Sequence, residues 1–441
     1  MSRKSKQSCD VTRREFVHAS AAAAAALTLP GAPALVGWGR ADTLRIGLVG
    51  CGGRGTGAAK DCLTSSERVE LVAIGDLFPD RVTECRANLA RMATEDTSGG
   101  LKTKIKLDDA HAFSGFDAYQ KVIGSKVDVV LLATPPAFRA RHLAAAIEAG
   151  KHVFMEKPVA VDPVEVRSVI ASADLAAQKG LAIVAGTQRR HDAGYRAAMQ
   201  RIHDGAIGDI VAAQVYWNQG GLWMKPRQPQ WSDVEWQIRN WLYFTWLSGD
   251  HIVEQHIHNI DVANWALGAH PVKAVGVGGR QWRTDPAYGH IYDHFAIDFE
   301  YANGVHVLSM CRQIDGTASH VAERIVGTHG RSDGHSVIEG AAPWSWDAQT
   351  PRTNPYVQEH ADLIASIRAG KPLNEGRQVA ETTLSAIMGR EAAYTGKEIT
   401  WDELLNAEQD LVPADVKFGP MPVAPVAMPG QTVLARSWRS A

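Results

Sequence analysis

The sequence has few cysteines and no strong excess of charge of either sign. Five cysteines occur in 441 residues, and no two of them are spaced as Cys-x-x-Cys. The absence of such a pair excludes a zinc knuckle, and the small number of cysteines excludes a dense disulfide framework. The formal net charge is -2, and no tract rich in Lys and Arg follows the N-terminal segment, so the chain lacks the basic surface that nucleic acid requires. We therefore expect no nucleic-acid partner and no metal site.

The chain also lacks an apolar run long enough to cross a bilayer. The Ala-rich run of residues 19–29 ends at Pro30, short of the roughly twenty residues that a spanning helix needs. Before it, Thr12-Arg13-Arg14-Glu15-Phe16 is typical of a twin-arginine export signal. We interpret residues 1–41 as a signal peptide, cleaved after Ala41 or after the earlier Ala34, and expect an exported, periplasmic protein without a membrane anchor. A basic tail followed by an alanine helix is the alternative.

From Leu44 onwards, short apolar runs alternate with helix-length amphipathic segments. With 45% hydrophobic and 21% charged residues, the chain has the composition of a soluble globular protein with two domains. Such alternation predicts a doubly wound parallel sheet, because parallel strands need a helix between them. The predicted strands are residues 44–50, 69–76, 127–134, 152–156 and 181–186, and helices are expected at 138–149 and 163–178.

The second half of the chain has a different pattern. From Val272 to Ile338, apolar and polar residues alternate between Gly-rich turns, which is typical of antiparallel strands with one covered face. The outer face of this sheet is our candidate surface for a homo-oligomer, a dimer or a tetramer. We predict an α/β fold with four parts: a signal peptide at 1–41, a Rossmann domain at 42–182, an α+β domain with a large, open, mostly antiparallel sheet at 183–410, and an extended C-terminal arm at 411–441, laid across a neighbouring subunit.

A glycine-rich turn follows the first predicted strand. Residues 50–55 read Gly-x-Gly-x-x-Gly where a strand leads into a helix, so backbone N–H groups can approach a pyrophosphate. Asp76 ends the next strand, where a carboxylate can bind the adenosine ribose and disfavour a 2′-phosphate. We therefore predict NAD as the cofactor, with NADP as the alternative because Arg81 is near. The predicted nucleotide-binding residues here are Gly50, Gly52, Gly53, Arg54, Gly55 and Asp76.

Two further motifs lie at the carboxyl ends of predicted strands, where ligands bind in open parallel sheets. The first is Thr134-Pro135-Pro136, followed by His142 early in the next helix, and the second is Glu156-Lys157-Pro158. We predict that Thr134, Pro135, His142, Glu156 and Lys157 contribute to the cofactor site. The alternative for Lys157 is a solvated surface side chain.

These motifs together resemble those of the Gfo/Idh/MocA oxidoreductases over roughly residues 44–400. The resemblance rests on the turn at 50–55, Asp76, Thr134-Pro135-Pro136, Glu156-Lys157-Pro158 and a later segment with an acid and a histidine. It implies a Rossmann domain followed by an open sheet, with a sugar or cyclitol between that sheet and the nicotinamide. It also implies that Lys157 contacts the substrate hydroxyl.

The acid-and-histidine segment spans residues 248–268. If it is one helix, Glu254 and His258 share a face with Asp261. His258 aligns with the catalytic histidine of the family, whereas Glu254 and His256 depart from its usual Asp and small residue. Three interpretations exist for the histidines: a zinc site, which the i, i+3, i+7 spacing of His251, Glu254 and His258 disfavours, buried structural side chains, and acid–base chemistry.

Aromatic residues are dense just upstream. Six of the thirteen tryptophans lie between residues 217 and 246, and aromatic faces with interleaved polar groups suit a carbohydrate ring. Arg189, Arg190 and His191 follow the last Rossmann strand and either reach the crevice or form a solvated basic turn. The predicted substrate-binding residues are Arg190, His256, Trp241 and Tyr243.

We expect an NAD(P)-dependent oxidoreductase that acts on a secondary hydroxyl of a sugar or sugar derivative with a tightly held cofactor. His258 is the predicted general base, Lys157 the hydrogen-bond donor to the reacting oxygen, and Glu254 the residue that orients them. One alternative is a hydrolase, lyase or epimerase that oxidises its substrate only transiently. Another is a non-catalytic sugar-binding relative.

Overall fold

A computed structural model of the chain describes residues 42–347 and 349–434. The predicted signal peptide at 1–41 lies outside the described residues, as do residues 435–441 of the predicted arm. Six parallel strands form the first sheet in the order β3-β2-β1-β4-β5-β6. They are β1 (Leu44–Val49), β2 (Val69–Asp76), β3 (Ala112–Ser114), β4 (Val129–Leu132), β5 (His152–Met155) and β6 (Ile183–Ala185).

Helices cover both faces of this sheet, as the alternation of strands and helices predicts. Leu63 of α2 and Val82 of α3 pack on one face, whereas Val122 of α5, Leu143 of α6 and Val169 of α7 pack on the other. The helices are α2 (Gly53–Ser65), α3 (Pro79–Glu95), α4 (Gly100–Lys104), α5 (Ala118–Gly124), α6 (Arg139–Glu148) and α7 (Pro163–Gln178), with 3₁₀ turns at η1 (Asp109–His111) and η2 (Pro136–Phe138). The prediction of a doubly wound sheet is confirmed.

Nine strands form the second sheet, in the order β14-β13-β12-β11-β7-β10-β9-β8-β15. Only β7 and β10 run parallel among the described pairs, so the prediction of a mostly antiparallel sheet is confirmed. The central strand β7 precedes the region that we predicted as strands. The strands are β7 (Ile210–Gln219), β8 (Pro271–Gly279), β9 (His294–Tyr301), β10 (His306–Gln313), β11 (His320–Gly327), β12 (Gly330–Ser332), β13 (Val337–Gly340), β14 (Trp344–Ser345) and β15 (Ile399–Thr400).

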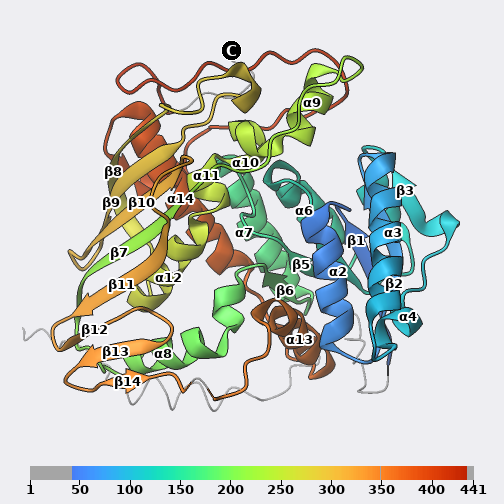
Figure 1. Cartoon of the computed structure of the whole chain (residues 1–441), viewed down its shortest axis with the longest axis horizontal. Coiled ribbons are helices and arrows are strands. Elements are labelled where there is room, and N and C mark those ends of the chain that lie inside the picture. Colours follow the sequence, from blue (N-terminus) through green and yellow to red (C-terminus); the bar gives the residue numbers. More distant parts are fainter. Residues whose placement is uncertain (1–41, 348, 435–441) are drawn as a thin grey trace, which may run out of the picture. The chain divides into compact units, whose positions relative to one another are not determined.

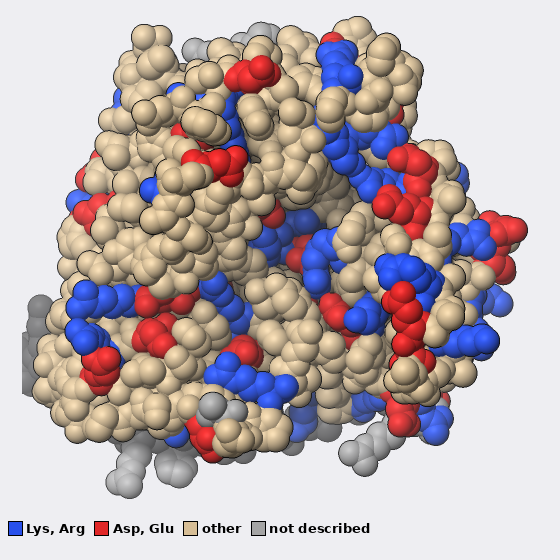
Figure 2. All heavy atoms as spheres, viewed as in Figure 1, with Lys and Arg blue, Asp and Glu red and all other residues tan. Residues whose placement is uncertain are grey.

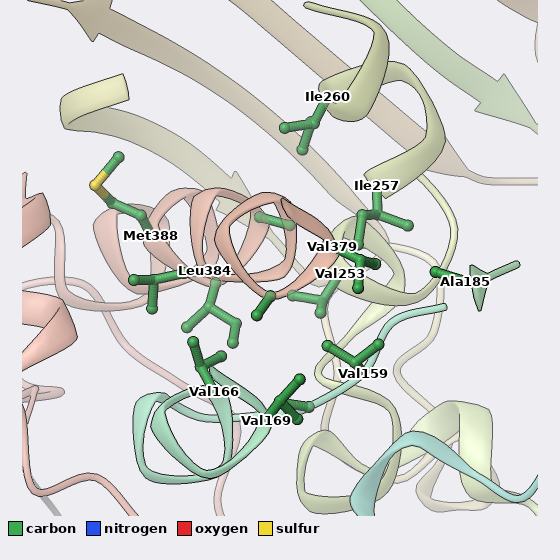
Figure 3. Close-up of a cluster of buried hydrophobic side chains, with 14 of the residues drawn as sticks. Val159, Val166, Val169, Ala185, Val253, Ile257, Ile260, Val379, Leu384 and Met388 are labelled. Carbon is green, nitrogen blue, oxygen red and sulfur yellow. The ribbon is translucent and has the colours of Figure 1, made fainter. Parts of the chain in front are cut away.

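Helix α14 joins the two halves of the core. Leu384 and Met388 of this helix pack with Val166 of α7 and Ile257 of α12 in one continuous apolar cluster (Figures 1 and 3). The remaining helices are α8 (Ala193–His203), α9 (Asp233–Arg239), α10 (Thr245–Ser248), α11 (His251–Glu254), α12 (Ile257–Leu267), α13 (Pro355–Arg368), α14 (Gly376–Thr395) and α15 (Trp401–Leu405), with 3₁₀ turns at η3 (Gln188–His191), η4 (Trp241–Tyr243) and η5 (Pro286–Tyr288).

The boundary that we predicted at residue 182 is too early. Strand β6 (Ile183–Ala185) pairs with β5 and therefore belongs to the Rossmann sheet. Helix α13 also returns to this half, because its Leu363 and Ile364 pack in the same apolar cluster as Leu63 of α2. The face on which α13 packs is decided by contacts that are remote in the sequence.

The predicted C-terminal arm lies along its own chain as far as residue 434. Its backbone accepts hydrogen bonds from the backbone N–H of Val234 and from Gln237 of α9, and the hydroxyl of Tyr292 donates to the carbonyl of Ala427. A contact with a neighbouring subunit stays a prediction. Among the described helices, none is both long and apolar enough to cross a membrane.

Candidate active site

The turn after β1 is shaped by glycines at two positions. Gly50 has φ of +99°, which only glycine adopts readily, and a Cβ on it would lie 2.6 Å from the carbonyl carbon of Ala133. A Cβ on Gly55 would lie 1.8 Å from the carbonyl oxygen of Gly50, so the helix can start this close to the strand only with glycine. By contrast, a Cβ on Gly52 or Gly53 would meet nothing within 4 Å. The turn therefore leaves open space beside the N-terminus of α2, as a dinucleotide pyrophosphate requires.

The carboxylate of Asp76 is bound to this turn. It accepts hydrogen bonds from the backbone N–H of Cys51 at 2.7 Å and of Phe78 at 3.0 Å. Asp76 thus stands at the end of β2 where the sequence predicts a ribose contact, and it also holds two loops together. The glycine turn and Asp76 fit an NAD cofactor, and Gly50, Gly52, Gly53, Gly55 and Asp76 would hold it.

Arg54, within the same turn, forms ion pairs with buried acids. Its guanidinium lies 2.5 Å from Glu156 and 3.5 Å from Glu359 of α13, and it covers the ring of Tyr356 at 4.7 Å. Burial and the nearby charge of Glu156 raise the pKa of Glu359. Arg54 therefore links the nucleotide turn to the Glu-Lys-Pro segment and to α13, a link that the sequence did not indicate.

His142 and Thr134 lie together, as the strand-end prediction requires. The hydroxyl of Thr134 is 3.3 Å from Nδ1 of His142, whose ring stacks on Tyr119 with centroids 4.1 Å apart. Burial lowers the pKa of His142 to about 3, so this ring is neutral at pH 7. The pair is positioned beyond β4, and its contact with the nucleotide stays a prediction.

Lys157 is held by the segment that carries the predicted catalytic acid. Its ammonium donates to the backbone carbonyl of Glu254 at 2.5 Å and to the carboxylate Oε1 of the same residue at 3.1 Å. An ammonium has three N–H groups, so one remains for another acceptor. Only 13% of the Lys157 side chain is exposed, which rules out the solvated surface alternative.

His258 lies near Lys157 with its ring stacked on Trp217, at a centroid distance of 5.7 Å. Burial, and then the positive charges of Lys157 and Arg189, lower the pKa of His258 well below its usual value. The imidazole is therefore neutral at pH 7 and can accept a proton. The structure brings Lys157, Glu254 and His258 together, as we predicted.

The prediction that Glu254 and His258 share one face of a single helix is wrong, however. Helix α11 ends at Glu254 and α12 begins at Ile257, so Glu254 and His258 are not on one helix. Between the two helices, His256 is fully buried and its Nε2 lies 2.8 Å from the hydroxyl of Ser309. No described group of three or more His, Cys, Asp or Glu side chains has a metal-binding arrangement.

The predicted substrate-binding residues are mostly engaged elsewhere. Arg190 forms a two-point ion pair with Asp261, at 2.8 and 3.0 Å. Tyr243 is 1% exposed and donates to backbone carbonyls of residues 222 and 223. Tyr243 and His256 are thus buried and engaged within the protein, whereas a substrate contact of Arg190 stays a prediction. Trp241 is partly exposed, and its role as a substrate contact stays a prediction.

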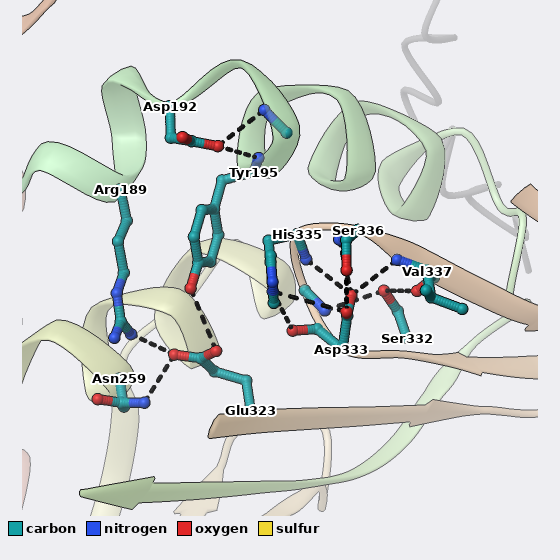
Figure 4. A network of polar contacts seen from close by, with 12 residues as sticks. Arg189, Asp192, Tyr195, Asn259, Glu323, Ser332, Asp333, His335, Ser336 and Val337 are labelled. Atoms are coloured by element: carbon teal, nitrogen blue, oxygen red, sulfur yellow. Dashed lines mark hydrogen bonds and ion pairs between the residues drawn. The ribbon is translucent and has the colours of Figure 1, made fainter. Parts of the chain in front are cut away.

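Arg189, rather than Arg190, reaches the neighbourhood of His258. It pairs with Glu323 of β11, which also accepts hydrogen bonds from Asn259 at 2.7 Å and from Tyr195 at 3.3 Å (Figure 4). Its guanidinium lies 5.6 Å from the ring centroid of Trp217. The space-filling view shows a hollow in the middle of one face, with basic and acidic side chains gathered at its bottom (Figure 2).

Two family profiles match the chain. Residues 44–187 match an oxidoreductase family with an NAD-binding Rossmann fold, and residues 195–332 match the GFO/IDH/MocA C-terminal domain. The first match runs past β6, in agreement with the sheet.

Curated relatives align with parts of the chain. Inositol 2-dehydrogenase 3 of Saccharopolyspora erythraea is 30% identical over 60% of this chain and 65% of its own length. Inositol 2-dehydrogenase of Rhizobium meliloti is 25% identical over 74% of this chain and 90% of its own. A glycosyl hydrolase family 109 protein of Stenotrophomonas maltophilia is 28% identical over 55% of this chain and 51% of its own.

Solved structures share the fold. Aldose-aldose oxidoreductase of Caulobacter crescentus superposes with a TM-score of 0.62 at 18% identity, over 81% of this chain and 99% of the other. Scyllo-inositol dehydrogenase of Lactobacillus casei superposes with a TM-score of 0.60 at 19% identity, over 81% and 99%. At these identities the likeness concerns the fold alone.

Proposed function

Because the chain belongs to the Gfo/Idh/MocA family of NAD-binding oxidoreductases, we propose that it oxidises a secondary hydroxyl of a sugar or cyclitol. One observation carries the proposal. The ammonium of Lys157 has two of its three N–H groups on Glu254, and its positive charge is near enough to help lower the pKa of the buried His258 imidazole. A donor and a proton acceptor thus stand together at the carboxyl edge of the Rossmann sheet.

Each residue has a role in this reaction. His258 takes the proton of the substrate hydroxyl, and the free N–H of Lys157 donates to the same oxygen while it becomes a carbonyl. Glu254 positions Lys157 through its backbone and its carboxylate. NAD, when bound, supplies the acceptor for the hydride that leaves the carbon.

The test begins with the purified protein. Denaturation should release NAD(H), or NADP(H) if the alternative holds, and the loaded enzyme should form reduced nucleotide when mixed with myo-inositol, scyllo-inositol or D-glucose. Absence of both nucleotides, together with no binding of added NAD, would contradict the proposal.

A second candidate is transient oxidation, with hydride returned to the product. It is favoured by the similarity to the glycosyl hydrolase family 109 protein. His256, the additional imidazole next to the predicted base, is buried with its Nε2 on Ser309 and is therefore not placed to assist the extra proton transfer that this mechanism needs. Mass spectrometry of the product distinguishes the candidates: loss of two hydrogens indicates net oxidation, whereas addition of water or an unchanged mass indicates a recycled cofactor.

We also propose that the enzyme retains its cofactor, which is consistent with export of a folded protein. An apolar cluster, here called the roof, links Phe78 and Ala137 of the Rossmann loops with Trp236, Trp246 and Met421. Arg239 of α9 adds a two-point ion pair with Asp80, at 2.9 and 3.0 Å, and lies 3.8 Å from the ring centroid of Phe78. Because Phe78 donates to Asp76, the roof is connected to the nucleotide site.

The twin-arginine signal and the oligomer are proposals of the same kind. Replacement of Arg13 and Arg14 by Lys should keep the protein in the cytoplasm, which fractionation of cells would measure.

On the second sheet, four residues that lie opposite one another on neighbouring strands present apolar side chains: Val277, Ala296, Met310 and Tyr216. Of these, Val277 is 70% exposed. A homo-oligomer through this face predicts that Met310→Lys yields a monomer in light scattering, whereas an unchanged mass would contradict it.

A further inference from the structure

Three glutamine side chains meet beside the predicted catalytic residues. Gln219 and Gln313 are the last residues of β7 and β10 and lie directly opposite each other in the parallel pair. Gln255 lies in the break between α11 and α12, next to Glu254. The three side chains therefore come from segments far apart in the sequence.

Their hydrogen bonds form two branches that converge on one oxygen. In the first, Nε1 of Trp217 donates to Oε1 of Gln219 at 2.7 Å, and Nε2 of Gln219 donates to Oε1 of Gln255 at 3.3 Å. In the second, the guanidinium of Arg283 donates to Oε1 of Gln313, and Nε2 of Gln313 donates to Oε1 of Gln255 at 2.8 Å.

The chemistry of the outer members fixes the orientation of every amide. Indole and guanidinium nitrogens donate hydrogen bonds and cannot accept them. Gln219 and Gln313 must therefore present their oxygens to Trp217 and Arg283 and their nitrogens to Gln255. A flip of either amide would place two donors face to face, so the usual ambiguity between amide oxygen and nitrogen does not arise here.

The amide nitrogen of Gln255 is consequently the part of this side chain that can still form hydrogen bonds, and it can only donate them. Its oxygen accepts from both neighbours, and its Nε2 has no hydrogen-bond partner among the described residues. The side chain is partly exposed, whereas Gln313 and Arg283 are each 2% exposed. Gln255 adjoins Glu254, which holds Lys157, and the Trp217 branch stacks on His258.

From this arrangement we infer that Gln255 determines substrate specificity by donating its amide N–H to a substrate oxygen other than the one bound by Lys157. The inference rests on the proposed function and specifies the substrate further: a polyhydroxylated ring with an acceptor oxygen facing the sheet. Gln219, Gln313, Trp217 and Arg283 are positioning residues, because they act through Gln255.

Gln255→Glu tests the inference with almost no change of shape. A carboxylate still accepts from Gln219 and Gln313, so both branches persist, but it cannot donate. With myo-inositol, scyllo-inositol and D-glucose as probes, KM of the reacting probe should rise at least about tenfold while kcat changes less than about threefold. Acidification should reduce the defect relative to wild type, because the introduced carboxyl group regains a donor when it is protonated. Gln214→Glu, on the outer face of the same strand β7, should leave KM unchanged.

Binding is measured separately from turnover, by calorimetry of the same probes with the NAD-loaded protein. Weaker binding by Gln255→Glu supports the inference even if wild type does not oxidise the probe, an outcome that would contradict the proposed function alone. Equal KM and equal binding in wild type and variant would overturn the inference and leave the proposed function intact. If wild type neither binds nor oxidises any of the three probes, both are overturned. Retained nucleotide reports that the variant is folded.

Discussion

At the nucleotide half of the site, the groups that would bind the cofactor come from short strand-to-helix turns, whereas at the sugar half they come from remote segments. The first half consists of the turn at 50–55, Asp76 and Glu156, each at the carboxyl end of a strand of one sheet. The second half combines Lys157 of the Rossmann domain with Glu254, Gln255 and His258 of the second domain. In the first half a glycine-shaped backbone turn would meet the pyrophosphate, whereas in the second half paired side chains would meet the substrate.

This difference suggests why one fold can serve many substrates. A glycine turn binds a pyrophosphate through main-chain N–H groups, which most substitutions at neighbouring non-glycine positions leave in place. The sugar half depends on hydrogen bonds between side chains, each of which can change by a single substitution. The predictions below test whether the two halves can be damaged separately.

The largest effect is expected at Lys157. Lys157→Ala removes the donor to the reacting oxygen, and kcat should fall by about a hundred- to ten-thousandfold, as for loss of acid–base catalysis. Bound nucleotide, measured after denaturation, should fall far less than kcat, because the glycine turn and Asp76 would still hold the cofactor. Lys121→Ala, on the surface of α5, is the matched control. Wild-type turnover in the Lys157 variant would remove the basis of the proposed mechanism.

Gly55→Ala should damage the nucleotide half first. The added Cβ would meet the carbonyl oxygen of Gly50 at 1.8 Å, and the backbone there cannot move without distorting the turn. Nucleotide affinity should fall about ten- to a hundredfold, equivalent to the roughly 1–3 kcal/mol that overpacking costs. In the control Gly57→Ala, on the same helix, the added Cβ meets only the far end of Arg54 at 3.9 Å. This variant should bind NAD with wild-type affinity, which fluorescence titration measures. Equal affinities of the two variants would show that the turn tolerates a side chain.

Arg239→Ala tests whether the roof slows release of the cofactor. The variant loses the ion pair with Asp80 and the contact with Phe78, so the dissociation rate of NAD should rise about tenfold, a change of roughly 1.4 kcal/mol. Arg227→Ala is a close control, because Arg227 also pairs with an acid and covers Trp236 but touches only its own domain. A displacement assay by stopped flow measures both rates. Equal dissociation rates of NAD in the Arg239 and Arg227 variants would show that the roof does not slow release of the cofactor.

The smallest effect concerns stability and the buried His256. Burial lowers the pKa of His256 to about 3, whereas the unfolded chain protonates it near the ordinary value of about 6.5. Below that pH the unfolded state binds a proton that the folded state does not, so the stability from the neutral ring is present above about pH 6.5 and is lost as the pH falls. Between pH 6.5 and 5.5, the free energy of unfolding of wild type should therefore fall by about 1 kcal/mol more than that of His256→Gln, as measured by urea denaturation.

The fold and the nucleotide half were predictable because their signals are local. Strands β1, β2 and β5 and helix α7 lie where apolar runs and periodicity predict them, and the glycine turn lies between β1 and α2. Lys157 was predictable from the resemblance of its Glu-Lys-Pro segment. Arg189 was considered only as one of three basic residues, because nothing local distinguishes it from Arg190.

The break between α11 and α12 shows where local signals end. Helical spacing predicts one helix through Glu254 and His258, but the side chain of Gln255 bonds to Gln219 and Gln313, and that of His256 to Ser309. These partners lie on β7 and β10, so the side chains at the break are held by residues that are remote in the sequence.

The sequence by itself thus determined the doubly wound sheet, the nucleotide turn, Asp76 and the identity of the Lys157 and His258 pair. The tertiary structure alone decided that Glu254 holds Lys157, that Arg54 pairs with Glu359 of α13, and which way the amide of Gln255 points. The physical reason is that backbone turns follow from neighbouring residues, whereas a buried charge or amide is oriented by whichever donors and acceptors the rest of the chain brings to it.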